Sequence, residues 1–165
     1  MSSPRTLLSA ILLATLVGCG GGDPLAQDVA DYHARVTPTL QTNQSMSQQF
    51  LELTRELKGN NITSDEIAQR WEQQIVPQAD ELKNEIIAIE PQTAELQDLH
   101  SQLTFSWSER AEAYQQMLDA FKGNQPDKFK KAFDRNLKAK LTEEQYFNQV
   151  NVLLQPYDLK LSPYQ

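Results

Sequence analysis

Beyond residue 22 the chain contains only two glycines, Gly59 and Gly123, and each is followed by Asn. Glycine after a periodic apolar segment commonly ends a helix, because it adopts the left-handed conformation without a Cβ clash. No strand-like alternation of apolar and polar residues occurs, and no hairpin dipeptide is present. The two glycines therefore predict a chain that is divided into long helical blocks.

Apolar residues recur every three or four positions in these blocks, which places them on one face of a helix. In the first block they are Leu25, Val29, Tyr32, Val36, Leu40, Met46, Phe50, Leu53 and Leu57. In the second they are Ile67, Trp71, Ile75, Ala79, Leu82, Ile86 and Ile89. In the third they are Leu96, Leu99, Leu103, Trp107, Ala111, Tyr114, Leu118 and Phe121. In the fourth they are Phe129, Phe133, Leu137 and Leu141, then, after a slip in phase, Phe147, Val150, Leu154 and Tyr157.

Prolines indicate where these helices bend or end. Pro38 and Pro77 lie inside the first two blocks, and because proline removes a backbone hydrogen bond they should kink or divide the helix. Glu90–Thr93 indicates a tight turn in which Pro91 ends one helix and Thr93 could cap the next. A continuous helix that is kinked at Pro91 is the alternative.

Two capping-box patterns add to these signals. Thr63 with Glu66 should begin the second block. Thr142 with Gln145 lies at the slip in phase, so we expect a bend or break near Leu141.

Four blocks of similar length joined by short turns favour an all-α fold, an up-down-up-down four-helix bundle with Pro-kinked long helices. We assign residues 25–158 to the bundle and residues 159–165 to a C-terminal tail. Trp71 and Trp107 fall within the apolar stripes and are expected in the core.

The N-terminal segment differs from the bundle. Met1–Arg5 carries one basic residue, and Leu7–Val17 is an unbroken run of apolar and small residues. This run is too short to cross a bilayer, which needs roughly 20 apolar residues, but it fits a secretory signal. It ends in Leu16-Val17-Gly18-Cys19, which contains the only cysteine.

This ending resembles the lipobox of bacterial lipoproteins, with aliphatic Leu16 three positions before Cys19 and small Gly18 next to it. The resemblance covers residues 1–19. It implies that residues 1–18 are removed by cleavage between Gly18 and Cys19, that Cys19 carries a diacylglycerol on its sulfur, and that its new amino group is often acylated. An ordinary signal peptide with a chance cysteine is the alternative.

Residues 19–24 would then form a lipid-anchored cysteine and a Gly-rich tether, which is typical of a flexible linker. The four residues Gly20–Asp23 reach about 14 Å when fully extended, so the folded part should lie close to the membrane. An Asp directly after the lipidated cysteine resembles the inner-membrane retention signal of enteric lipoproteins, and this chain has Gly20 at that position. Its presence favours the outer membrane, on the periplasmic side.

Composition excludes several functions. Without residues 1–18 the chain holds 14 basic and 22 acidic residues, a formal net charge of −8, which argues against nucleic-acid binding. A single cysteine leaves no internal disulfide and no thiolate zinc site. The sequence also lacks HExxH, Gly-x-Ser-x-Gly, a phosphate-binding glycine loop and CxxCH. We therefore expect no catalytic residues, no metal site and no cofactor.

His33 and His100 each flank an apolar stripe and could point inward. A bundle with inward histidines can hold haem or a metal, and Met46 could be an axial haem ligand. The alternative, hydrogen-bonded histidines at the core boundary, is favoured because no metal-ligand spacing is present.

Residues 127–140 hold six basic residues and two acidic ones, a local charge of +4. Lys128, Lys131, Arg135 and Lys138 are spaced three, four and three, so they form one stripe on a helix. This basic stripe is a possible contact surface for an acidic partner or for anionic lipid headgroups. A solvated helix face is the alternative.

Our first hypothesis is a non-enzymatic, lipid-anchored bundle of the cell envelope that acts by protein–protein contact, as an accessory or assembly factor. The membrane is one partner, through the lipid at Cys19, and envelope proteins are the others. The alternative is a carrier bundle that holds an apolar or haem-like ligand between its helices.

Substitution of Cys19 by Ser should abolish lipidation, because only a thiol can carry the thioether-linked lipid. We expect the Cys19→Ser protein to accumulate as an uncleaved or water-soluble precursor. Detergent partitioning and mass spectrometry of the mature amino terminus measure both effects. A wild-type protein that is water-soluble and starts at another residue would contradict the prediction.

Overall fold

The computed structural model describes residues 23–59 and 62–162, and the lipobox with Cys19 lies outside this part of the chain. The long helices are α1 (Pro24–Lys58), α4 (Ala94–Lys122) and α5 (Pro126–Leu154). Between α1 and α4, α2 (Ser64–Arg70) continues through a π-helical turn, η1 (Trp71–Ile75), into α3 (Val76–Ile87). A 3₁₀ turn, η2 (Gln155–Tyr157), follows α5. The described residues contain no strand, so the all-α prediction is confirmed.

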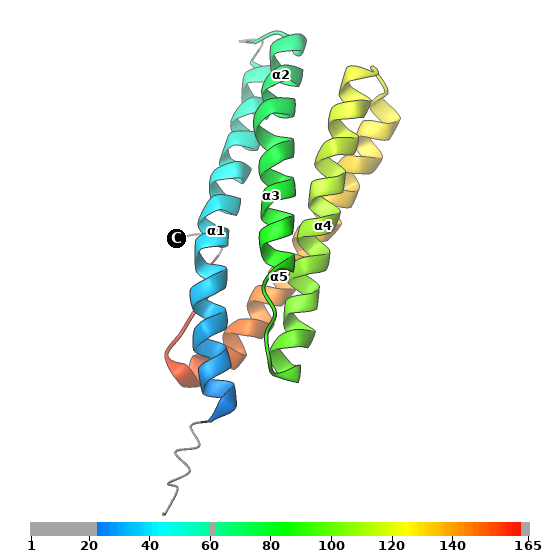
Figure 1. The fold of residues 1–165 in the computed structure, drawn as a ribbon. Coiled ribbons are helices and arrows are strands. Elements are labelled where there is room, and N and C mark those ends of the chain that lie inside the picture. Colours follow the sequence, from blue (N-terminus) through cyan, green and yellow to red (C-terminus); the bar gives the residue numbers. More distant parts are fainter. Residues whose placement is uncertain (1–22, 60–61, 163–165) are drawn as a thin grey trace, which may run out of the picture.

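The helices form two antiparallel hairpins, one of α1 with α2–α3 and one of α4 with α5 (Figure 1). The hairpins pack together at the end where α1 begins and separate towards the end that holds α2 and the α4–α5 turn (Figure 1). We call the end that holds α2 and the α4–α5 turn the open end. The observed order agrees with the predicted up-down-up-down bundle.

One continuous core fills the bundle and contains both tryptophans. Trp71 is 4% exposed and Trp107 is 3% exposed, as predicted from their positions in the apolar stripes. Residues after η2 run back along the start of α1, where Leu161 is buried and Asn151 exchanges two hydrogen bonds of 2.8 Å with its backbone.

Neither internal proline divides its helix. α1 continues through Pro38, which lies on an exposed face beside exposed Ala34, so water can satisfy the carbonyl that loses its partner. Before Pro77 the backbone forms η1, in which the Val76 N–H donates to the Trp71 carbonyl five residues back. Such a π turn accommodates the missing proline N–H without ending the helix.

The predicted turn at Pro91 is confirmed, since α3 ends at Ile87 and α4 begins at Ala94. Thr93 is the N-cap residue, but its side chain makes no cap bond of its own. Instead, the carboxylate of Asp28 on α1 accepts the backbone N–H groups of Gln92 and Thr93 at 2.7–3.0 Å and the Thr93 hydroxyl at 2.7 Å. A negative charge at this position also suits the positive end of the α4 dipole.

The two capping boxes have different outcomes. Thr63 and Glu66 form the predicted reciprocal pair at the start of α2. Thr142 and Gln145 do not, because α5 is continuous from Pro126 to Leu154 and the Thr142 hydroxyl donates to the Lys138 carbonyl. The predicted break near Leu141 is therefore wrong.

Helix ends also fall at both glycines, although neither glycine is left-handed. Gly59 and Gly123 have φ of −80° and −81°, and the left-handed residue after α4 is Asn124, with φ of 50°. Asn tolerates this conformation better than most residues other than glycine.

Asp28 should stabilise the fold in a pH-dependent way. Burial raises the pKa of its carboxyl, but the bonds from Gln92 and Thr93 outweigh burial and leave the pKa below its usual value. A lowered folded-state pKa contributes stability above the unfolded pKa of about 3.9, and this stability is lost as the pH falls through the folded pKa.

We therefore expect Asp28→Asn to lower the free energy of unfolding by about 1–2 kcal/mol at pH 7, the size of a lost helix cap. The difference from wild type should shrink below about pH 3.9. Urea denaturation at several pH values measures it, and Asp31→Asn, an exposed change on the same helix, is the matched control. Equal losses for both variants would contradict this role of Asp28.

Candidate functional site

A buried ion pair lies at the centre of the bundle. Arg110 on α4 donates through Nη1 to Glu143 Oε2 on α5 at 2.7 Å, and both residues are 5% exposed. Burial alone would lower the pKa of Arg110, but the nearby carboxylate of Glu143 and hydroxyl of Tyr114 outweigh burial and raise this pKa above its usual value. The guanidinium therefore stays charged. An ion pair this deep is stable only when neighbouring groups satisfy its remaining hydrogen bonds.

Those neighbours come from α1 and α4. Asn43 Nδ2 and Trp107 Nε1 both donate to Glu143 Oε1, at 2.8 and 3.0 Å. Arg110 Nη2 donates to Ser47 Oγ at 3.1 Å on α1, while its Nε has no partner in the described structure. The cluster therefore ties α1, α4 and α5 together at one level of the bundle.

A second polar cluster lies closer to the start of α1. The hydroxyls of Tyr32 and Tyr146 are 2.8 Å apart, and Tyr32 also bonds to His100 Nδ1 at 3.1 Å. His100 Nε2 bonds to the Thr104 hydroxyl at 3.2 Å. Burial lowers the pKa of His100 and raises the pKa of both tyrosines, so all three rings are neutral near pH 7.

The predicted inward histidines therefore have partners within the protein. His100 is buried with both ring nitrogens bonded to hydroxyls, while His33 is half-buried and bonds through Nε2 to the Lys160 carbonyl at 3.0 Å. Met46 packs in the hydrophobic core. In residues 23–59 and 62–162 no three His, Cys, Asp or Glu side chains come together as a metal site.

The predicted core stripe at the start of α5 is wrong for three of its four residues, while Phe129 is half-buried and packs against the core. Phe133, Leu137 and Leu141 are 37%, 45% and 58% exposed, and we call them the α5 ridge. The buried positions are instead Ala132, Asn136, Ala139 and Glu143. Four-residue steps advance about 400° around a helix of 3.6 residues per turn, so a stripe spaced only by fours drifts about 40° per step. It leaves the core within three steps.

In the basic stripe beside the ridge, Arg135 forms ion pairs within the described part of the chain and the three lysines do not. Arg135 bonds to Glu109 through Nε and Nη2 at 2.7 Å and to Glu112 at 2.5 Å, which links α5 to α4. These carboxylates raise the pKa of Arg135 further above its usual value. Lys128, Lys131 and Lys138 are exposed, and no ion pair found among the described residues includes them.

Two adjoining hollows occupy the open end. The first, which we call the aromatic cavity, has a volume of about 240 Å³. Its walls are Phe50, Leu53, Thr54, Leu57, Lys58, Ile67, Trp71, Phe121, Phe129 and Phe133. The second, which we call the end cleft, has a volume of about 750 Å³ and shares Leu57, Phe121 and Phe129 with the cavity.

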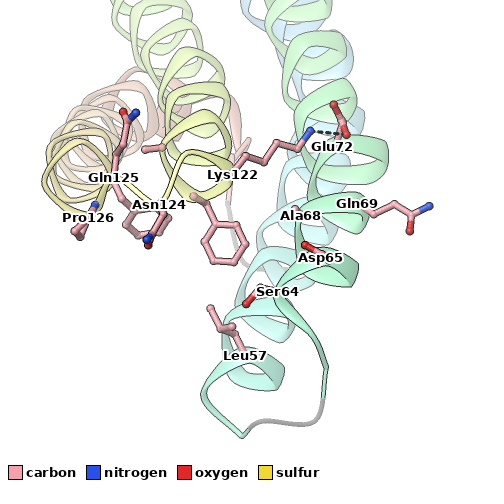
Figure 2. Close-up of a pocket in the computed structure, with 13 residues that line it drawn as sticks. Leu57, Ser64, Asp65, Ala68, Gln69, Glu72, Lys122, Asn124, Gln125 and Pro126 are labelled. Carbon is pink, nitrogen blue, oxygen red and sulfur yellow. Dashed lines mark ion pairs between the residues drawn. The ribbon is translucent and has the colours of Figure 1, made fainter.

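The end cleft is more polar and opens between α2 and the α4–α5 turn. Figure 2 shows Leu57, Ser64, Asp65 and Ala68 on one side and Asn124, Gln125 and Pro126 on the other. Lys122 on α4 reaches across to Glu72 on η1 and forms an ion pair of 2.7 Å (Figure 2).

These features define an all-α bundle in residues 23–59 and 62–162, and the sequence ahead of it resembles the signal of bacterial lipoproteins. The chain belongs to the family of EMYY-motif containing lipoproteins, whose model matches residues 2–124. The match ends at the turn before α5, and the run Glu-Met-Tyr-Tyr does not occur in the sequence. No curated protein and no solved structure matches the chain.

Family membership makes the protein a lipid-anchored protein of the bacterial cell envelope. No helix within the described residues is long and apolar enough to cross a bilayer.

The Arg110–Glu143 pair gives a test of what closes the bundle. Arg110→Met leaves the Glu143 charge buried without its partner, and we expect a loss of about 3–5 kcal/mol in the free energy of unfolding. Adding Glu143→Gln removes that charge but keeps an oxygen that can accept from Asn43 and Trp107. The double variant should therefore be more stable than Arg110→Met alone. Chemical denaturation of the single and double variants measures the coupling, and strictly additive losses would contradict it.

Proposed function

We propose that the protein acts by protein–protein contact, as a non-enzymatic accessory or assembly factor of a larger envelope system. Its signal peptide would be removed before Cys19, and its lipid would hold it on the periplasmic side of the outer membrane. The α5 ridge is the observation that carries the proposal, because it offers a partner an apolar surface on a rigid helix.

The ridge differs from scattered surface leucines. Single exposed apolar residues are common, but Phe133, Leu137 and Leu141 follow one another on successive turns of α5. Lys130 and Lys138 lie within three or four positions of ridge residues, so basic groups border it. An apolar centre with a charged rim is the usual composition of a protein-contact surface.

Charge favours an acidic partner. Lys128, Lys131 and Lys138 remain available on α5, whereas Arg135 already serves Glu109 and Glu112. Rim charges of this kind mainly increase the association rate and make binding sensitive to salt. The proposed contact surface therefore consists of the three lysines of the basic stripe, without Arg135, together with the α5 ridge.

A carrier function is the second candidate, and the aromatic cavity is the observation that favours it. The histidines give no support for haem as the ligand, because His100 has both ring nitrogens bonded to hydroxyls and His33 is bonded to a backbone carbonyl.

Replacing Leu137 and Leu141 by Ser should weaken partner binding without unfolding the bundle. Both side chains are about half exposed, and surface substitutions usually change stability by no more than about 0.5 kcal/mol. We expect the full-length, lipidated Leu137→Ser/Leu141→Ser protein to lose most crosslinked partner in intact cells. Quantitative mass spectrometry after crosslinking measures the loss.

Ile87→Ser is the matched control, because Ile87 is 50% exposed but lies on α3. A second variant, Lys128→Gln/Lys131→Gln/Lys138→Gln, should bind the partner more weakly than wild type at low salt. It leaves the ion pairs of Arg135 intact. An unchanged set of crosslinked proteins in both α5 variants would refute the proposal.

A further inference from the structure

The aromatic cavity has a composition unlike the rest of the core. Five aromatic side chains line it, and its only polar side chains are Thr54 and Lys58. Trp71 is central to this set, with ring centroids of Phe50, Phe121 and Phe129 at 5.2, 6.4 and 6.2 Å. Small-molecule sites are typically concave and apolar, with a few polar groups that fix the orientation of the ligand.

One of the aromatic side chains of the cavity also carries a polar group, and this group lacks a partner. The indole Nε1 of Trp71 is buried and has no hydrogen-bond acceptor in the described structure, although Trp71 itself is 4% exposed. Buried N–H groups are nearly always bonded, so one without a partner calls for an explanation. The other tryptophan follows the rule, since Trp107 donates to Glu143 at 3.0 Å.

A positive charge lies at the same cavity. Lys58 lines it, is exposed, and takes part in none of the ion pairs found among the described residues. A sphere of the cavity's volume is about 8 Å across, roughly the Debye length at physiological ionic strength. A single anionic group in the cavity would therefore be attracted by the Lys58 ammonium, and it would reach the Trp71 N–H, which is closed to solvent in this structure, after a small rotation of the indole.

We propose that the aromatic cavity binds a free single-chain carboxylate of the fatty-acid type, with the chain among the aromatic rings and the carboxylate at Trp71 and Lys58. A volume of about 240 Å³ suits one short chain rather than the two chains of a phospholipid. The adjoining end cleft leaves an open route to solvent, and a longer chain could extend into it past Leu57 and Phe121.

The ligand cannot be the protein's own anchor. α1 has 35 residues, and at 1.5 Å per residue the open end lies about 50 Å from the start of α1. An acyl group on Cys19 is joined to α1 by only four residues, which reach about 14 Å, and an acyl chain that spans one leaflet of a hydrocarbon core roughly 30 Å thick adds about 15 Å. The carboxylate must therefore arrive from outside the molecule.

Photo-crosslinking of the full-length, lipidated protein in phosphatidylcholine nanodiscs tests the site. The probe is octanoate with a diazirine at the end of its chain, and the crosslinked residues are mapped by mass spectrometry. We expect labelling within residues 50–58, 67–71 and 129–133, and competition by unlabelled octanoate. Octan-1-ol, which has no charge, should compete more weakly, and octylammonium should not compete.

Variants test the two polar groups. Trp71→Phe removes the N–H and should weaken octanoate competition about tenfold, the effect of one hydrogen bond to a charged group. Lys58→Gln should weaken it about fivefold, as expected for one surface charge at short range. Lys138→Gln, an exposed change outside the cavity, is the matched control and should have no effect.

Labelling that is spread over the surface, or that octanoate does not displace, would overturn the proposal. So would unchanged competition in both Trp71→Phe and Lys58→Gln, provided that circular dichroism shows each variant folded. Because Lys58 is exposed, its variant stays informative even if Trp71→Phe fails to fold. Phe133 belongs to both the cavity wall and the α5 ridge, but none of these variants alters Phe133, Leu137 or Leu141, so loss of octanoate binding and loss of the ridge partner remain distinguishable.

Discussion

The Arg110–Glu143 ion pair is the interaction on which the closure of this bundle depends. α4 and α5 already pack along their lengths as a hairpin, but α1 is far from α5 in sequence and meets it through polar groups. Asn43 bonds to the same carboxylate, and Ser47 bonds to the same guanidinium. A buried pair of charges adds little net stability over an apolar core, yet a misaligned helix would leave the charges unpaired at high cost. The pair therefore acts mainly by fixing the register of α1 against α4 and α5.

Much of the fold follows from local sequence rules, because helix ends are determined by residues close to one another. The Thr63–Glu66 cap and the end of α3 before Pro91 are of this kind, and both were predictable, whereas the cap of α4 comes from the distant Asp28. The buried face of the first half of α5 was not, because Phe129, Phe133, Leu137 and Leu141 are spaced only by fours. α4 mixes threes and fours over Leu103, Trp107, Ala111, Tyr114 and Leu118, so its stripe stays on one face and reaches the core.

The buried polar residues escaped prediction for a different reason. Arg, Glu and Asn are mostly exposed in proteins, so a reading of apolar spacing passes over them. Their positions nevertheless carry a signal: Arg110 lies three after Trp107 and four before Tyr114, and Glu143 lies three before Tyr146. Glu143 is thus the core residue at the apparent slip in phase near Leu141, which is why α5 passes that point without a break. The Trp71 N–H without a partner and the cavity around it are tertiary features that no local pattern reports.

The aromatic cavity follows from the same constraint that closes the bundle. Beyond Glu143 towards the open end, α5 buries only small or polar side chains, Ala139, Asn136 and Ala132. Small residues at a helix contact let the two axes approach, so α5 stays close to α4 there. α1 continues for 15 residues past Asn43, about 22 Å, without a comparable tie to α5. Rings from α1, η1, α4 and α5 fill most of the space that remains, and large flat rings that meet edge to face leave a void between them. The polar tie in the middle of the bundle thus places an apolar hollow at the end farthest from the start of α1.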